Sequence, residues 1–290
     1  MPKQILMTCL LLAVLATACQ KTGTDNNTTN NQYNADSSYS LQNIAYGTDG
    51  KQVMDIYLPA HRAAATTKVF VLVHGGGWSE GDKSEFNDTY NTLKTLYPNY
   101  AIANLNYRLG TATSPGYPKQ IDDIKAAIAK LKSGQFGVSN QYFMVGASAG
   151  AHLSMLYSYG FDDNKEVKAV CNVIGPADLT DPAYAYNILY AAIYVNLVGQ
   201  VTYDQNPSLY AEVSPAMRVT TSSPATISFY GDQDPVVPVS QMPRLHNALS
   251  AKGVYNEFTM YAGEGHGGWN QAHTTDMINK LKAFIAAHFN

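Results

Sequence analysis

Four separate segments of this sequence carry groups suited to nucleophilic catalysis, and the first is built around Ser148. The stretch GASAG at 146–150 fits the pattern G-x-S-x-G and directly follows an apolar run. This pattern is typical of a serine on a strained strand-to-helix turn, where bulky neighbours have no room. The pattern alone is weak, because Gly, Ala and Ser are common and a tight turn can contain a serine by chance.

A second segment, HGGGW at 74–78, follows the apolar run KVFVLV at 68–73. Three consecutive glycines let the backbone approach a ligand and turn its N–H groups toward developing negative charge. A flexible turn has the same composition. However, HGGG follows an early strand and precedes a serine on a strand-to-helix turn, which we call the serine elbow. This is the arrangement expected for an oxyanion loop, whose backbone N–H groups bind a negatively charged oxygen.

The third segment supplies a base and the fourth supplies an acid. A serine nucleophile needs a group that takes its proton near neutral pH, and histidine is suited to this role. Of seven histidines, His266 stands out because it lies in the glycine-rich stretch GEGHGGW near the C-terminus. Asp234 in FYGDQDPVVP completes the chain order serine, acid, histidine. Asp232 is the alternative acid, and Glu264 is disfavoured because it is close to His266 in sequence.

The elements that must position these segments alternate in type along the chain. An alternating run at 52–59 predicts an early strand with one exposed face. Nearly continuous apolar runs predict strands buried on both faces at 68–73, 101–105, 142–145, 167–174, 225–230 and 257–261. Apolar residues at three- and four-residue spacing predict a helix at 119–133, and further helices are expected near 84–97, 149–159, 240–252 and 274–288.

This alternation predicts an α/β fold with a mostly parallel sheet and helices on both faces. Ligands of such sheets gather at the carboxyl ends of the strands. Residues 181–213 break the rhythm and are rich in tyrosine. They predict a small, partly helical cap insertion over the site, with ordinary crossover structure as the alternative.

The N-terminus predicts an exported protein. Residues 1–19 place Lys3 before a short apolar run and end in small residues and Cys19, which indicates a lipoprotein-type signal peptide. An ordinary secretory signal with an incidental cysteine is the alternative. The polar stretch 20–40 predicts a disordered tether, so 41–290 would be the folded domain. A lipid on Cys19 would anchor this domain to a membrane facing the periplasm or the cell surface.

Composition and charge narrow the kinds of partner, metal and cofactor to be expected. The net charge is −3 and no dense basic run occurs, which disfavours nucleic acid as a partner. Beyond Cys19 the chain has one cysteine, Cys171, in an apolar run, so it is expected to be a buried apolar residue. No cysteine spacing indicates zinc, and we expect no metal and no cofactor.

Five segments in order carry a family resemblance: HGGGWSEGDK, NYRL, GASAGAHL, GDQDPVVP and GHGGW. With them the chain resembles the α/β-hydrolase superfamily, and within it the esterase and lipase group that has an HGGG-W loop. The resemblance covers about residues 42–290. It implies Ser148 as nucleophile, His266 as base and Asp234 as its partner. It implies an oxyanion hole from the backbone amides of Gly76, Gly77 and Ala149.

Other positions match this group less directly. Arg108, Asp122 and Asp123 look like structural residues of the group, in which a charged pair braces the oxyanion loop. Tyr230 is a departure, since relatives often have histidine before the glycine. This difference is not expected to affect the triad.

The resemblance implies a serine esterase that works through an acyl-enzyme on small-molecule or carbohydrate esters. Exported members include acetyl-xylan and feruloyl types, which favours short acyl or carbohydrate-linked esters. An amidase of the kynurenine formamidase type is an alternative within the enzymes. A non-catalytic surface lipoprotein that kept the fold is the alternative outside them. The oligomeric state stays open.

Overall fold

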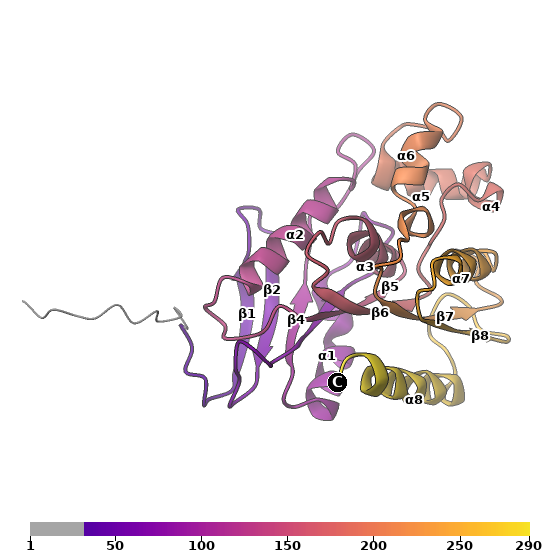
Figure 1. The fold of residues 1–290 in the computed structure, drawn as a ribbon. Helices are drawn as coiled ribbons and strands as arrows, with labels where there is room; N and C mark the ends of the chain where they lie inside the picture. Colours follow the sequence, from indigo (N-terminus) through magenta and orange to yellow (C-terminus); the bar gives the residue numbers. More distant parts are fainter. Residues whose placement is uncertain (1–31) are drawn as a thin grey trace, which may run out of the picture.

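The computed structural model describes residues 32–290, except for the side chains of residues 188 and 189. The predicted signal peptide, Cys19 and most of the predicted tether therefore lie outside the described residues. Eight strands form one sheet in the order β1-β2-β4-β3-β5-β6-β7-β8 (Figure 1). Their bounds are β1 (Tyr39–Ala45), β2 (Val53–Leu58), β3 (Val69–Val73), β4 (Ala101–Leu105), β5 (Tyr142–Ala147), β6 (Val167–Val173), β7 (Ala225–Gly231) and β8 (Asn256–Tyr261).

The sheet is mostly parallel, as predicted. β1 pairs antiparallel with β2, and β2 pairs antiparallel with β4, whereas every later neighbour pair from β4 to β8 is parallel. The central strands β3 and β4 are buried along their whole length, which is why their sequences are continuous apolar runs. The predicted α/β-hydrolase fold is confirmed by this sheet with helices on both faces.

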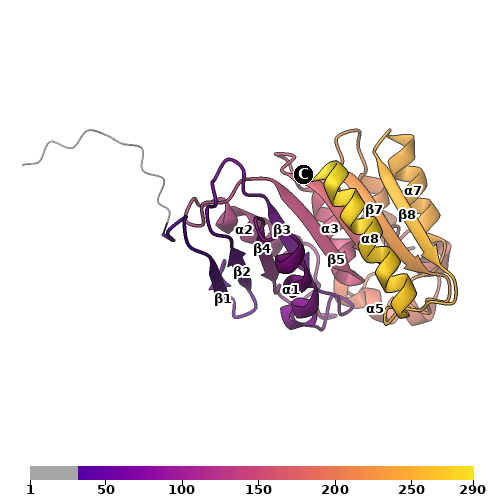
Figure 2. The same cartoon turned by 90° about the horizontal axis from the view of Figure 1, so that it is seen from below.

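Two helical layers cover the sheet (Figure 2). One face carries α1 (Asn87–Leu96), which follows the short 3-10 helix η1 (Lys83–Phe86), and α8 (Gln271–His288). The other face carries α2 (Lys119–Leu131), α3 (Ala149–Gly160) and α7 (Gln241–Ala251). Each layer buries its own apolar cluster against the sheet. The serine elbow is held in the middle, because it connects the central strand β5 to α3.

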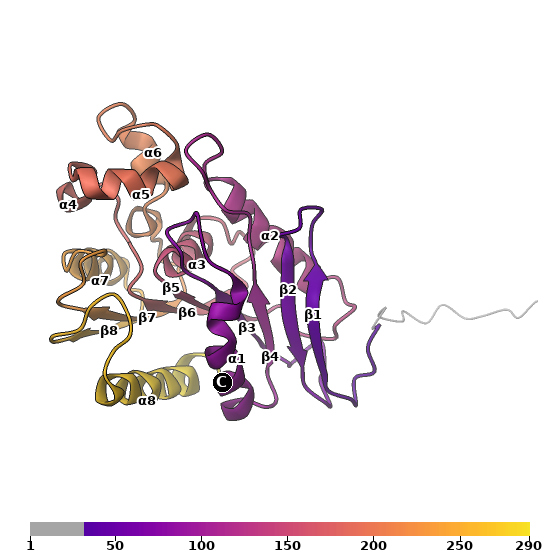
Figure 3. The same cartoon turned by 180° about the vertical axis from the view of Figure 1, so that it is seen from behind.

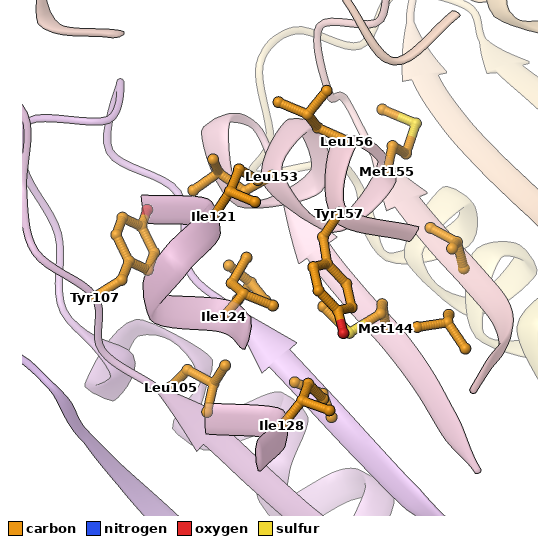
Figure 4. Close-up of a cluster of buried hydrophobic side chains, with 14 of the residues drawn as sticks. Leu105, Tyr107, Ile121, Ile124, Ile128, Met144, Leu153, Met155, Leu156 and Tyr157 are labelled. Atoms are coloured by element: carbon orange, nitrogen blue, oxygen red, sulfur yellow. The ribbon is translucent and has the colours of Figure 1, made fainter. Parts of the chain in front are cut away.

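The predicted apolar stripe of α2 forms one of these contacts. Ile121, Ile124 and Ile128 are nearly fully buried and face α3, where Leu153 belongs to the same cluster (Figure 4). Removing each such side chain from water stabilises the fold by about 1.5–3 kcal/mol. The packing fixes α3, and with it the start of α3 at the elbow.

Residues 181–213 contain three helices: α4 (Pro182–Ala185), α5 (Ile188–Val198) and α6 (Pro207–Glu212). The short 3-10 helix η2 (Pro215–Arg218) then leads back toward β7. α4, α5 and α6 form a group set apart from the sheet, beyond α3 and α7 (Figures 1 and 3). We call the segment 181–213 the cap.

The described part of the predicted tether contacts the folded domain. β1 begins at Tyr39, and the N–H of Gln32 donates to the carbonyl of Gln135 at 3.0 Å. The ring of Tyr33 stacks on Phe136 with centroids 5.9 Å apart. The folded domain of this structure therefore begins before residue 41. The ring of Tyr33 and the backbone hydrogen bond of Gln32 hold this polar segment against the domain. Within residues 32–290, no helix has the length and apolar character needed to cross a bilayer.

Candidate active site

Three loops at one end of the sheet bring together the hydroxyl, imidazole and carboxylate predicted from the sequence. His266 Nε2 lies 2.9 Å from Ser148 Oγ, and His266 Nδ1 lies 2.7 Å from Asp234 Oδ2. The Asp234 side chain is fully buried, and that of His266 is 23% exposed. With its Nδ1–H donated to the carboxylate, the neutral ring presents Nε2 as an acceptor for the serine hydroxyl. The geometry fits a nucleophile, a base and an orienting acid.

Ser148 has the strained backbone expected of an elbow. Its φ is 52° and its ψ is −124°, a region that residues with a side chain rarely adopt. A Cβ on Gly146 would lie 2.4 Å from the carbonyl oxygen of Gly150, and one on Gly150 would lie 2.0 Å from that of Val73. Both glycines of G-x-S-x-G are therefore required by close backbone contacts, and the turn aims the hydroxyl out of the sheet.

The glycine-rich loop passes directly beside the serine. A Cβ on Gly75 would lie 3.4 Å from the Cβ of Ser148. Gly76 has φ 106°, and a Cβ there would lie 2.2 Å from the carbonyl oxygen of Glu80. The predicted oxyanion donors lie on this loop and at the first position of α3. Within residues 32–290, no hydrogen-bond acceptor engages the N–H groups of Gly76, Gly77 and Ala149.

A buried histidine supports this loop from behind. Trp78 Nε1–H donates to His152 Nδ1 at 3.1 Å, and His152 Nε2–H donates to the carbonyl of Val213 at 2.7 Å. His152 is fully buried. Burial lowers the pKa of His152 to about 4, so the ring is neutral at pH 7. This neutral ring links the predicted oxyanion loop to the end of the cap.

Arg108 and Asp123 form a charged pair, but among the described residues their side-chain hydrogen bonds go to Gln52, Lys119 and each other, not to the oxyanion loop. Arg108 Nη2 lies 2.6 Å from Asp123 Oδ1, and the Asp123 side chain is fully buried. Gln120, three residues before Asp123 on α2, does reach the loop, since its Nε2 donates to the carbonyl of Trp78 at 2.7 Å. The hydrogen bonds of Asp123 go to the Arg108 segment and to Gln52. Asp122 is exposed, so the structure assigns no brace to it.

The alternative acids have other partners. Asp232 Oδ1 accepts the N–H of Gly263 at 2.7 Å. Glu264 Oε1 lies 2.6 Å from His273 Nδ1 and accepts the N–H of Asn270 at 3.0 Å. Both carboxylates therefore stabilise the loop that leads to His266 without meeting its ring. Asp234 alone among the three is hydrogen-bonded to His266.

Tyr230, the departure from the family pattern, lies buried beneath the site. Its hydroxyl donates to the carbonyl of Gly175 and accepts from Asn172 Nδ2, both at 2.8 Å. Asn172 Oδ1 in turn accepts the N–H of Gly175 at 2.8 Å. The tyrosine thus fixes the turn after β6 and lies outside the hydrogen-bonded chain of the candidate triad.

A cavity of about 880 Å³ opens in front of Ser148. The oxyanion loop, the elbow and His266 form one side of it. The cap forms the opposite side with Tyr184, Tyr190, Ile193, Tyr194 and Asn196. This volume is in the range of small-molecule sites. Sequence reasoning placed the cap near the site from its tyrosine content but could not say which tyrosines line it.

Two further kinds of group are metal-ligand clusters and the thiol of Cys171. Within residues 32–290, no group of three or more His, Cys, Asp or Glu side chains is placed to hold a metal ion. Cys171 is buried, and burial raises the pKa of its thiol to about 12. A thiol in this state is a poor nucleophile.

Comparison with known proteins agrees with the fold and with an esterase family. Residues 54–249 match the family model described as BD-FAE. The chain is 28% identical to Esterase LipC of Mycobacterium tuberculosis over 243 residues, which cover 77% of this chain and 59% of LipC. It is 37% identical to Kynurenine formamidase avaC of Aspergillus versicolor over 94 residues, which cover 29% of this chain and 33% of that protein. The chain therefore spans less than two thirds of these curated relatives.

Solved structures show the same fold. A truncated form of a carbohydrate esterase from gut microbiota superposes with a TM-score of 0.69 at 22% identity. The superposition covers 87% of this chain and 98% of that one. At this identity the likeness concerns the fold alone.

Proposed function

The chain belongs to the BD-FAE family, and on that premise we propose that it is a serine hydrolase that cleaves carboxylic esters. The observation that carries the proposal is the continuous hydrogen-bonded chain from Ser148 through His266 to Asp234. It lies beside backbone N–H groups that are free to bind an oxyanion. The activity given in the names of the relatives is consistent with it.

The proposed reaction has two steps. Ser148 Oγ attacks the ester carbonyl carbon while His266 Nε2 takes its proton, and Asp234 stabilises the imidazolium that forms. The N–H groups of Gly76, Gly77 and Ala149 bind the oxyanion, each supplying on the order of 3 kcal/mol of barrier lowering. The imidazolium then protonates the leaving alcohol. Water, activated by His266, releases the acyl group and restores the serine.

Short acyl or carbohydrate-linked esters are the proposed substrates. Tyrosines of the cap line the cavity opposite the serine, and their flat rings with polar ends suit contacts with sugar or aromatic groups. The carbohydrate esterase that shares the fold is a neighbour of this kind. No lysine or arginine lines the cavity among the described residues, whereas Glu80 and Glu85 do, so neutral esters fit it better than anionic ones.

The activity is tested with p-nitrophenyl acetate, butyrate and longer esters, with Ser148→Ala as the control. Loss of the nucleophile is expected to lower kcat by on the order of 10⁶-fold. A wild type no faster than Ser148→Ala on every ester and amide would leave the non-catalytic surface protein as the better explanation. Acetylated xylan and methyl ferulate then distinguish acetyl from feruloyl substrates.

An amidase of the kynurenine formamidase type is the second candidate. The local identity of 37% to such an enzyme favours it, although it covers only 29% of this chain. The same triad hydrolyses a formamide if the cavity places its carbonyl in the oxyanion hole. A kcat/KM for N-formylkynurenine above that for every ester would favour the amidase.

We also propose that the protein is exported and held at a membrane by a lipid on Cys19. The polar stretch that follows this cysteine would separate the domain from the surface. Labelled palmitate should be incorporated into the wild-type chain and not into Cys19→Ser. Equal incorporation in both would contradict the anchor.

A further inference from the structure

The cap contacts the loop that carries Asp234 through two tyrosine hydroxyls. Tyr190 Oη, on α5, donates a hydrogen bond to the carbonyl oxygen of Pro235 at 3.1 Å. The ring of Tyr190 packs edge-on against Tyr184, with centroids 4.8 Å apart. The hydroxyl of Tyr184 makes a longer contact of 3.4 Å to the carbonyl of Val236. Two neighbouring cap side chains thus reach two successive carbonyls of one loop.

The same two peptide units direct their N–H groups at the carboxylate of Asp234. The carbonyl of Pro235 shares a peptide with the N–H of Val236, which donates to Asp234 Oδ1 at 2.7 Å. The next peptide places the N–H of Val237 2.8 Å from the same oxygen. The other oxygen, Oδ2, faces His266. One hydrogen-bonded chain therefore runs from the Tyr190 hydroxyl to the imidazole.

This series of hydrogen bonds is expected to pass a change at the Tyr190 hydroxyl on to the carboxylate of Asp234, because the peptide group between them is a planar, conjugated unit. A donor on its carbonyl oxygen makes its N–H a stronger donor, and linked hydrogen bonds of this kind strengthen one another by about 10–30% each. The carboxylate of Asp234 is fully buried, so solvent screens these interactions little. Two N–H groups donate to Oδ1 of Asp234, and this orients Oδ2 toward the ring of His266.

The pKa values of both tyrosine hydroxyls are raised at this site. Burial raises the pKa of the Tyr190 hydroxyl, and the negative charge of Asp234 raises it further. Burial likewise raises the pKa of Tyr184 well above its usual value, with Asp234 among the smaller causes. Both hydroxyls therefore stay protonated at neutral pH and remain donors.

The same helix also meets the oxyanion loop. Ile193 follows Tyr190 by three residues on α5, so both side chains lie on one face of the helix. The Cγ2 of Ile193 lies 3.6 Å from the position of a Cβ on Gly77. α5 thus contacts the acid loop through Tyr190 and lies beside the oxyanion loop through Ile193.

We propose that Tyr190 is a positioning residue for the acid of the triad. Its hydroxyl holds the Pro235–Val236 peptide with the N–H on Asp234, and thereby sets how strongly the carboxylate engages His266. The inference rests on the proposed function and assigns the cap a part in it beyond covering the substrate.

The test is Tyr190→Phe, which removes one oxygen atom. Its matched control is Tyr186→Phe, four residues earlier, where the side chain is 64% exposed and the hydroxyl donates to Asp204 at 3.2 Å. The pH dependence of kcat/KM is measured on p-nitrophenyl acetate. The far-downfield NMR signal of the proton between His266 and Asp234 is recorded without substrate, so that loss of a substrate contact cannot mimic the effect.

We expect Tyr190→Phe to lower kcat about 3- to 10-fold, the equivalent of one hydrogen bond. Weaker N–H donors leave more negative charge on the carboxylate, which favours the protonated imidazole. The acid limb of the pH profile should therefore move to higher pH by roughly 0.2–0.5 unit. The NMR signal should move in Tyr190→Phe and stay at the wild-type position in Tyr186→Phe.

An acid limb and an NMR signal that match those of Tyr186→Phe would overturn the inference, even if kcat falls, because Tyr190 also lines the cavity. A difluorinated tyrosine at position 190 is a stronger donor and should move the acid limb to lower pH, which keeps the test sound if the phenylalanine variant folds poorly. A wild type without activity would contradict the proposed function. The comparison of the NMR signals of Tyr190→Phe and Tyr186→Phe would still decide the role of Tyr190.

Discussion

Replacing His152 with glutamine is expected to remove a pH-dependent part of the free energy of unfolding. The ring is fully buried between Trp78 and Val213, and it accepts a hydrogen bond from one and donates to the other. A protonated ring cannot accept from the indole N–H. Protonation therefore breaks the contact that ties the oxyanion loop to the end of the cap.

The size of the effect follows from the lowered pKa. Burial lowers the pKa of His152 to about 4 in the folded protein. An unfolded histidine has a pKa of about 6.5, so between these values the unfolded chain binds the extra proton. The contribution is fully present above about pH 6.5 and is lost as pH falls toward 4. It amounts to about 2 kcal/mol between pH 7 and pH 5, and to about 3 kcal/mol below pH 4.

The assay is urea unfolding at pH 7, 6 and 5, followed by circular dichroism. Glutamine in place of His152 can still accept from Trp78 and donate to Val213, but it does not titrate. The wild type should lose about 2 kcal/mol more than His152→Gln from pH 7 to pH 5. His61→Gln, whose side chain is 83% exposed, should follow the wild type. Equal losses in wild type and His152→Gln would refute the reasoning.

Three further changes act on separate parts of the site. Asp234→Asn should lower kcat by on the order of 10⁴-fold in steady-state assays, because the amide stabilises the wrong tautomer of His266. Gly76→Ala should lower kcat by about 10²- to 10³-fold with less change in KM, since its Cβ would lie 2.2 Å from a backbone oxygen and displace an oxyanion donor. Asp123→Asn should lower the free energy of unfolding by about 3 kcal/mol, measured with urea, because it leaves Arg108 without its buried partner.

Each of these changes has a matched control in the chain. Asp232→Asn tests a carboxylate that meets Gly263, and its kcat should stay within about twofold of wild type. Gly50→Ala adds a methyl group to open space and should leave kcat unchanged. Asp122→Asn changes an exposed carboxylate and should alter stability by less than about 0.5 kcal/mol. A control as damaging as its partner would contradict the corresponding assignment.

The sequence was sufficient to find the groups of the candidate triad because local backbone geometry restricts residue type there. Ser148 adopts a positive φ between two glycines that touch other backbone atoms, and only small residues satisfy such a turn. The parallel sheet then brings the ends of β5, β7 and β8 to one edge, so chain order pointed to the loops of Asp234 and His266, although it did not separate Asp234 from Asp232. The helix at 119–133 was equally evident, because one face of α2 packs on the core and the other is polar.

The side-chain contacts of the cap could not be predicted from the sequence for a physical reason. The α5 sequence ILYAAIYVNLV is apolar on nearly every side, so its pattern does not say which face meets the domain. Its decisive contact joins Tyr190 to Pro235 across 45 residues, and no local rule encodes such a pairing. The candidate nucleophile, base and acid are therefore held by a tight turn and by the parallel sheet, both of which leave a pattern in the sequence. The cap side chains have partners that only the folded structure reveals, and substrate preference has to be sought there.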